Sequence, residues 1–231
     1  MGIKAVGFDL DGTLYPAWLM YAVSVDIGLR HPRLLGAYSA ARRALRTPDP
    51  SSSSDSISAD DAKLTSRAFR ARQASVVAQS LGADTDSVAH YIDTLIYSVI
   101  EKRFRFIRPY KGVYACMRTL QRSGLRLGLL SDLPPEKKVL SLGFSDFFSP
   151  ILCSEDFGAL KPDPRPFSAL AAGFGVAPES ILYVGNKHAY DILGAKAFGM
   201  KTAFIGRGKD ADADFTFRRW DDLSRWILAR V

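Results

Sequence analysis

The sequence lacks several features that mark particular classes of protein. Its 231 residues include two cysteines, Cys116 and Cys153, which stand far apart and form no CxxC pair. Two cysteines are too few for a disulfide framework, and their spacing does not suit a metal or redox pair. We expect both to be buried free thiols, because unpaired cysteine is found mainly in protein interiors.

Long apolar runs are also absent. The longest apolar-looking stretch, residues 15–29, contains a proline, a serine and an aspartate and is too short to cross a bilayer. The chain passes from Met1 directly into a short apolar segment and two acids, without the basic stretch, long apolar core and cleavage site of a signal peptide. We therefore expect a cytoplasmic protein with no membrane span and no membrane partner.

Acidic residues are fewer than basic ones, and the net charge is +7. Such an excess favours an anionic partner such as nucleic acid, a phospholipid surface or a phosphorylated metabolite. Residues 30–46 contain several arginines and no acid, but no aromatic-rich nucleic-acid motif accompanies them. We interpret this stretch as a solvated helix face, with the entry of an anionic substrate as the alternative, and expect no nucleic acid partner. The arginines are Arg30, Arg33, Arg42, Arg43 and Arg46.

Short apolar runs alternate with helical patterns over much of the chain. Residues 4–8 form a brief apolar run that ends at Asp9, which is typical of a buried parallel strand. Strands that alternate with helices pair in parallel through right-handed crossovers. The sequence therefore predicts an α/β fold with a doubly wound parallel sheet. Further strands are expected at 125–130, 151–154, 181–184 and 202–205, and helices at 112–123, 166–174 and 190–198.

The alternation is interrupted by residues 16–108, which have helical patterns at 18–46, 61–81 and 86–104. We predict that they form an inserted all-helical domain, and that residues 1–15 and 109–231 form the α/β core. A serine-rich stretch flanked by proline, at about 48–59, predicts a mobile loop.

Two acids follow the first predicted strand. Asp9 and Asp11 are alternate residues of an extended segment, so their side chains project to the same side. Two carboxylates beside a hydrophobic strand end are costly unless a cation or a proton is shared between them. Oxygen ligands favour a hard ion, and Mg²⁺ suits a phosphate substrate. Ligands of such sheets lie beyond the carboxyl ends of the strands, where Ser131 and Asn186 are also expected. On its own, this pair could equally be a solvated strand end.

Four motifs, in this order, resemble the haloacid dehalogenase-like (HAD) superfamily. They are Asp-Leu-Asp-Gly-Thr-Leu at 9–14, Gly-Leu-Leu-Ser-Asp at 128–132, Lys-Pro-Asp-Pro at 161–164 and Gly-Asn-Lys-His-Ala-Tyr-Asp at 185–191. Residues 194–200 continue the likeness, which covers about 3–15 and 108–206. The resemblance implies a Rossmann-like sheet, hydrolase activity, and a cap of the C1 type formed by the helical insertion.

The resemblance also implies a two-step phosphoryl transfer. Asp9 would attack phosphorus to give an aspartyl-phosphate that water hydrolyses, and Asp11 would first protonate the leaving group and then deprotonate the water. Lys161 would offset the charge on Asp9 and on the phosphoryl oxygens. Ser131 and Asp132, together with Lys161, are predicted to bind the phosphate.

A metal site is implied at the same place. Its predicted ligands are the Asp9 carboxylate, the Asp11 main-chain carbonyl, Asn186 and Asp191, and its predicted ion is Mg²⁺. Asn186 stands where the family more often has an aspartate. Its amide oxygen can still coordinate, but the loss of one negative charge should weaken Mg²⁺ binding.

These residues favour a magnesium-dependent phosphatase that hydrolyses a small phosphorylated metabolite. A phosphomutase of the same superfamily would keep every core motif, and a non-catalytic binding or regulatory protein would fit Asn186 and the arginine-rich stretch. A haloacid dehalogenase needs no acid two residues after the nucleophile, so Asp11 argues against it. Trp18, Met20 and Tyr21 follow the nucleophile strand and either line the substrate entrance or belong to the core.

Overall fold

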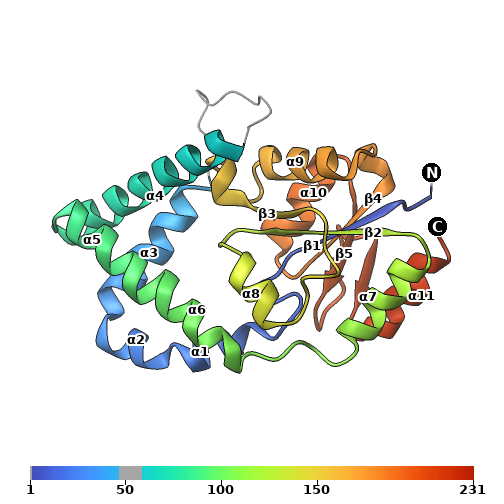
Figure 1. Cartoon of the computed structure of the whole chain (residues 1–231), viewed down its shortest axis with the longest axis horizontal. Helices are drawn as coiled ribbons and strands as arrows, with labels where there is room; N and C mark the ends of the chain where they lie inside the picture. Colours follow the sequence, from blue (N-terminus) through green and yellow to red (C-terminus); the bar gives the residue numbers. More distant parts are fainter. Residues whose placement is uncertain (1, 47–58) are drawn as a thin grey trace.

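In the computed structural model, which describes residues 2–46 and 59–231, the strands form one sheet (Figure 1). Within these residues the sheet has six strands in the order β3-β2-β1-β4-β5-β6, and every neighbouring pair is parallel. The predicted doubly wound parallel sheet is therefore confirmed. The strands are β1 (Ala5–Phe8), β2 (Arg126–Ser131), β3 (Ile151–Cys153), β4 (Ile181–Gly185), β5 (Lys201–Ile205) and β6 (Phe215–Phe217).

Helices cover both faces of this sheet (Figure 1). All four residues of β1 are buried, and they alternate between two hydrophobic clusters: Val6 packs on one face and Ala5 on the other. The first face carries α7 (Val113–Arg122) and α11 (Trp220–Leu228), and the second carries α9 (Pro164–Phe174) and α10 (Leu193–Ala197). Burial on both faces explains why the strands are short continuous apolar runs.

The chain between β1 and β2 forms a separate group of helices, which lies beside the sheet (Figure 1). We call residues 17–106 the helical module. Its interior is a hydrophobic cluster of its own, which includes Leu34, Tyr38, Val77 and Ile96. Its elements are α1 (Ala17–Val23), α2 (Val25–Arg30), α3 (Pro32–Ala44), α4 (Ala59–Leu81), α5 (Thr85–Tyr91), the π-helix η1 (Ile92–Ser98), α6 (Val99–Arg103) and η2 (Phe104–Phe106).

The first part of this module is divided into three helices. The helix expected over 18–46 is wrong as a single element, because the chain breaks at Ser24 and at His31. Pro32 opens α3, and a residue that precedes proline is disfavoured in the helical conformation. The serine-rich stretch, residues 51–58, lies outside the described residues.

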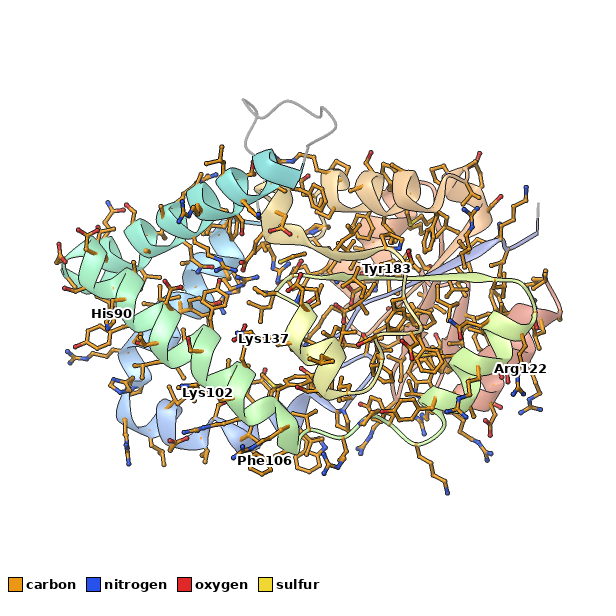
Figure 2. All side chains as sticks on the ribbon, in the orientation of Figure 1. His90, Lys102, Phe106, Arg122, Lys137 and Tyr183 are labelled. Carbon is orange, nitrogen blue, oxygen red and sulfur yellow. The ribbon has the colours of Figure 1, made fainter. Side chains whose placement is uncertain are left out.

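Several short elements were not expected from the sequence. Besides β6 and α11, they include α8 (Glu136–Ser141), which lies between the sheet and the helical module (Figure 1). Lys137 of α8 points toward the module, where its Nζ lies 2.6 Å from Glu101 (Figure 2). The remaining unexpected short helices are η3 (Ser154–Phe157) and η4 (Pro178–Ser180). The helix predicted over 190–198 is present as η5 (His188–Ile192), which continues directly into α10.

Two predictions made from composition can be compared with this structure. Both cysteines are buried and unpaired, as predicted, and burial raises the pKa of Cys116 to about 12. Among the described residues, no helix combines the length and the apolar character that crossing a bilayer requires.

Candidate active site

Three of the predicted side chains, those of Asp9, Lys161 and Asp191, meet beyond the carboxyl ends of β1 and β4. Lys161, which is 2% exposed, places its Nζ 2.7 Å from Asp9 Oδ1 and 2.7 Å from Asp191 Oδ1. Its third close partner is the Tyr183 hydroxyl at 3.0 Å. Although burial opposes the charge, Asp191 and Asp9 raise the pKa of Lys161 well above its usual value. Lys161 is therefore a fixed cation between two buried carboxylates.

Asp9 is the acid whose ionisation this environment perturbs most clearly. Burial raises its pKa to about 7, Asp191 and Asp11 act in the same direction, and Lys161 opposes them. Thr13, which has no assigned role in the sequence motif, donates a hydrogen bond of 2.7 Å to Asp9 Oδ2. Both oxygens of Asp9 are thus oriented by neighbours, and additional positive charge would favour its ionised form.

The turn after Asp9 depends on Gly12. This residue has a φ of +91°, in the left-handed region that favours glycine. A Cβ atom at this position would lie 2.3 Å from Nδ2 of Asn186. Glycine therefore allows the Asn186 side chain to approach the loop after β1, where Thr13 Oγ1 donates to Asn186 Oδ1 at 3.3 Å.

Asp11 is held by residues that the motifs do not contain. Lys138 of α8, which is 3% exposed, lies with its Nζ 2.8 Å from each carboxylate oxygen of Asp11. The buried Tyr15 hydroxyl also donates to Asp11, and burial together with Asp11 raises the pKa of Tyr15 well above its usual value. The sequence analysis assigned no role to either Tyr15 or Lys138.

Ser131 and Asp132 differ in what their side chains do. Ser131 Oγ accepts from the Leu133 main-chain N–H at 3.2 Å and makes a longer contact of 3.4 Å with Asp11 Oδ2. The Asp132 carboxylate instead pairs with Arg46 at 2.7 Å and accepts from the Lys161 main-chain N–H at 3.1 Å. Burial opposes ionisation there, but Lys161 and the nearby arginines lower the pKa of Asp132. The Asp132 carboxylate is therefore engaged within the protein, and an ionised carboxylate has no proton to donate to a phosphate. The phosphate contact of Asp132 stays a prediction.

Asp191, which is predicted to be a metal ligand, has partners within the protein on both carboxylate oxygens. Its Oδ1 is bound by Lys161, and its Oδ2 accepts from the main-chain N–H groups of Asn186 and Lys187 at 3.1 and 2.9 Å. Its carboxylate packs so closely under Gly185 that a Cβ there would meet it. Asp191 therefore holds the loop after β4, and both of its oxygens are used within the protein.

The remaining predicted metal ligands fit a hard cation. The Asp9 carboxylate, the Asp11 carbonyl and the Asn186 amide present oxygen donors only, from the adjacent strand ends of β1 and β4. Oxygen-only sets suit Mg²⁺ and not the soft metals. The raised pKa of Asp9 agrees with this, since a cation beside that carboxylate would lower it.

A cavity opens above these residues. It has a volume of about 370 Å³ and lies between the loop after β1 and the helical module. Asp11 and Tyr15 line it from the strand side, and Met20 and Tyr21 line it from α1. Trp18 is not among its lining residues and is 65% exposed, so of the three residues predicted either to line the entrance or to belong to the core, Met20 and Tyr21 line the cavity.

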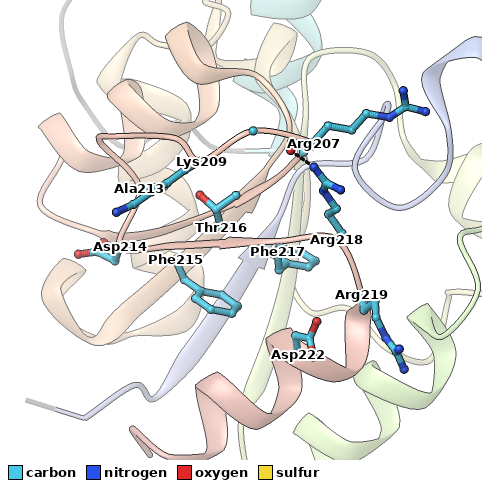
Figure 3. Close-up of a pocket in the computed structure, with 12 residues that line it drawn as sticks. Arg207, Lys209, Ala213, Asp214, Phe215, Thr216, Phe217, Arg218, Arg219 and Asp222 are labelled. Carbon is cyan, nitrogen blue, oxygen red and sulfur yellow. Dashed lines mark hydrogen bonds between the residues drawn. The ribbon is translucent and has the colours of Figure 1, made fainter.

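Polar side chains gather at two further places. A hollow of about 710 Å³ lies over β6 and the loop before it, where Arg207, Lys209 and Arg218 surround Phe215 (Figure 3). It shares no lining residue with the cavity above Asp11.

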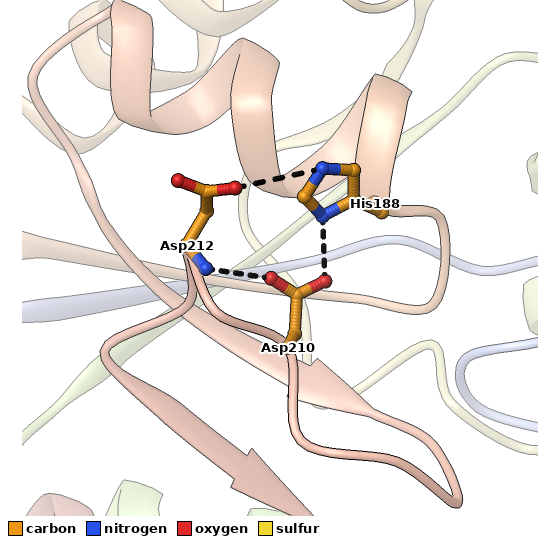
Figure 4. Close-up of side chains that lie close together, drawn as sticks. All are labelled: His188, Asp210 and Asp212. Carbon is orange, nitrogen blue, oxygen red and sulfur yellow. Dashed lines mark hydrogen bonds and ion pairs between the residues drawn. The ribbon is translucent and has the colours of Figure 1, made fainter.

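The second place is His188, whose ring lies between two acids (Figure 4). Its Nδ1 is 2.7 Å from Asp210 and its Nε2 is 3.6 Å from Asp212. A metal ion would take one ring nitrogen, whereas here opposite nitrogens face different carboxylates. We read this group as a polar contact between the loop after β4 and the loop before β6.

Comparison with known proteins agrees with this geometry. Residues 3–199 match the family of haloacid dehalogenase-like hydrolases. The chain belongs to this family. The resemblance in the sequence and the prediction of a hydrolase are thereby confirmed.

Individual HAD relatives extend the comparison. The glyceraldehyde 3-phosphate phosphatase of Methanopyrus kandleri is 28% identical over 92% of this chain and 88% of its own length. The enzyme of the same name from Pyrococcus furiosus is 33% identical, but over 52% of this chain and 51% of its own length. Among solved structures, the 2-haloacid dehalogenase of Pseudomonas syringae pv. tomato has a TM-score of 0.66 at 26% identity, with 99% of both chains covered.

Proposed function

We propose that this HAD hydrolase is a magnesium-dependent phosphatase that acts on a small phosphomonoester through an aspartyl-phosphate on Asp9. The observation that carries the proposal is the position of Asp9, oriented by Lys161 and Thr13 at one strand end with Asp11 two residues on. The phosphatases among the relatives support the same reaction class.

In the first step, an oxygen of Asp9 attacks phosphorus and the bond to the leaving oxygen breaks. Asp11 gives that oxygen its proton, so the product leaves as an alcohol. Lys161 offsets negative charge on the reacting oxygens from its fixed place beside Asp9. Mg²⁺, when bound by Asp9, the Asp11 carbonyl and Asn186, would supply further positive charge against the phosphoryl oxygens.

In the second step, Asp11 takes a proton from water, which attacks the aspartyl-phosphate and regenerates Asp9. Ser131 is suited to hold the phosphoryl group during both steps. Its contact with Asp11 is 3.4 Å long, at the limit of a hydrogen bond, so turning the hydroxyl toward a phosphate oxygen costs little. Lys138 keeps the Asp11 carboxylate directed into the cavity.

We further propose that residues 16–108 act as a cap domain over the core formed by residues 1–15 and 109–231. Two arginines, Arg42 in α3 and Arg46 just after it, connect the helical module to the core. Arg42 lies 2.6 Å from the fully buried Glu155, and Arg46 lies 2.7 Å from Asp132. These pairs join the helical module to the core beside Ser131 and hold water away from the site.

The test is phosphate release from a generic aryl phosphate and from a panel of metabolite phosphates, with Mg²⁺ or with EDTA. Wild type should release phosphate only with the metal, and Asp9→Asn should abolish release. The exposed Asp146→Asn is the matched control and should behave as wild type. Equal activity in EDTA, or full activity of Asp9→Asn, contradicts the mechanism.

The same panel separates the alternatives. A phosphomutase would interconvert phosphate isomers with little release of free phosphate. Halide released from a 2-haloacid without metal would support a dehalogenase, in line with the structural likeness to such an enzyme. Binding of a phosphorylated ligand without turnover of any substrate would favour a regulatory protein.

A further inference from the structure

The cavity above Asp11 has an apolar wall on the side where a leaving group would lie. That wall is formed mainly by residues of the helical module. Among the described residues that line the cavity, the charged side chains are Asp11 and Lys187. The apolar lining includes Met20, Ile27, Leu35, Leu95, Ile96 and Leu133.

Tyrosine rings and the small side chains of Ser24 and Ser39 complete the wall, and two of the tyrosine hydroxyls already have partners. The Tyr15 hydroxyl donates to Asp11, and the Tyr38 hydroxyl accepts from Arg42 at 3.4 Å. Ring faces therefore remain for contact with a ligand, and ring faces favour apolar or aromatic groups.

The arginines that could have bound an anionic leaving group are directed elsewhere. Arg42 donates to the Glu155 carboxylate and to the main-chain carbonyl of Asp132. Arg46 donates to the Asp132 carboxylate, and its guanidinium lies 3.8 Å from the centre of the Tyr190 ring. Neither arginine lines the cavity. The segment outside the described residues, 47–58, contains no lysine or arginine in its sequence. None of the five arginines of the arginine-rich stretch, residues 30–46, lines the cavity. Arg30, Arg33 and Arg43 are exposed, as the prediction of a solvated helix face requires, but that prediction is wrong for Arg42, which is buried.

A carboxylate-bearing leaving group would be unfavourable in such a cavity. It would lose water against an apolar wall, and Lys187 is the one basic side chain among the described lining residues that could balance its charge. An apolar group of the same shape would gain from burial instead, by about 0.8 kcal/mol for each CH₂.

Resting on the proposed phosphatase function, we propose that the substrate is the phosphate monoester of a neutral, largely apolar alcohol or phenol. The volume of about 370 Å³ limits that group to a branched alkyl chain or a small ring system. Phosphorylated hydroxy acids and phosphoamino acids are poor substrates on this reading.

A matched pair of esters tests the substrate class. In 3-methylbutyl phosphate and 3-phosphooxypropanoate, an isopropyl group and a carboxylate of similar shape occupy the same position. Wild type should hydrolyse the first with a kcat/KM at least about tenfold higher, as the burial of apolar carbon and the desolvation of the carboxylate both require. An equal or higher kcat/KM for the carboxylate ester overturns the inference.

Variants of Leu35 locate the effect in the cavity. Leu35→Arg places a cation on the wall and should narrow or reverse the preference by raising kcat/KM for the carboxylate ester. Leu35→Met, of similar length but uncharged, should keep the wild-type preference. A preference that is the same in both variants would show that this wall does not select the substrate.

Binding measurements keep the two proposals distinguishable. Calorimetry on Asp9→Asn with Mg²⁺ should show at least about tenfold tighter binding of 4-methylpentylphosphonate than of 4-phosphonobutanoate. This preference without turnover in wild type would uphold the apolar site and refute the phosphatase. The reverse preference in binding would refute the apolar site even if wild type hydrolyses many esters.

Discussion

Replacing Asp9 by asparagine should stabilise the metal-free protein, by an amount that grows with pH. The pKa of Asp9 lies at about 7 in the folded protein, against 3.8 as its ordinary value, because the carboxylate is buried near Asp191 and Asp11. A raised folded-state pKa contributes stability that is fully present below about 3.8 and is lost as pH rises through about 7. Ionised Asp9 thus destabilises the folded protein, and the neutral Asn side chain removes that destabilisation.

The size of the effect follows from the same two values. A rise in pKa from 3.8 to about 7 means that ionised Asp9 lowers the free energy of unfolding by about 4 kcal/mol well above pH 7. At pH 5 this destabilisation is less than half as large. Between pH 5 and pH 8 the advantage of the variant should therefore grow by about 3 kcal/mol. For a chain of 231 residues, this amounts to roughly 5–10 °C in Tm.

Thermal unfolding in EDTA at both pH values measures this difference, with the exposed Asp146→Asn as the control whose Tm change should not vary with pH. Added Mg²⁺ should stabilise wild type more than Asp9→Asn at pH 8, because the ion binds the carboxylate. A Tm gain of the same size at pH 5 and pH 8, or a loss at pH 8, would refute the reasoning.

Three further outcomes are expected. Lys138→Met should lower kcat at least about tenfold with little change in KM, because Asp11 loses the cation that orients it. Lys138→Arg should restore part of the rate. An unchanged kcat of Lys138→Met in steady-state assays would show that Lys138 does not act in the site. Asn186→Asp should tighten Mg²⁺ binding about tenfold in calorimetry, and the same or weaker affinity would show that Asn186 is not a ligand. Glu155→Gln leaves Arg42 buried without its counter-charge and should lower the free energy of unfolding in urea by about 3 kcal/mol. The control Glu179→Gln, at an exposed position, should lower it little. Equal losses in the two variants would contradict this prediction.

The sheet and the meeting of Asp9, Ser131 and Asn186 could be predicted from the sequence for a physical reason, whereas Lys161 was predicted from the family resemblance alone. Parallel strands end on the same edge, so residues that directly follow apolar runs become neighbours wherever they stand in the chain. The position of a polar residue directly after a predicted strand was therefore enough to place it at this edge of the sheet.

Other parts of the site left no such signal. Lys138 lies on a helix of six residues that follows two prolines, which is too short for a hydrophobic period to show. The pairing of Arg42 with Glu155 joins residues 113 positions apart, and nothing local to either residue predicts it. The oxygens of Asp191 illustrate the same limit, because the sequence shows an acid but not the donors that surround it.

The double pairing of Lys161 has a consequence for the whole reaction cycle. In the proposed mechanism, Asp9 carries a phosphoryl group after the first step, and its carboxylate can then no longer balance the ammonium charge by itself. Asp191, at 2.7 Å on the other side, remains as a permanent counter-ion. The lysine can therefore stay protonated through both chemical steps, and the electric field that it exerts on the attacked phosphorus stays nearly constant from the arrival of the ester to the departure of inorganic phosphate.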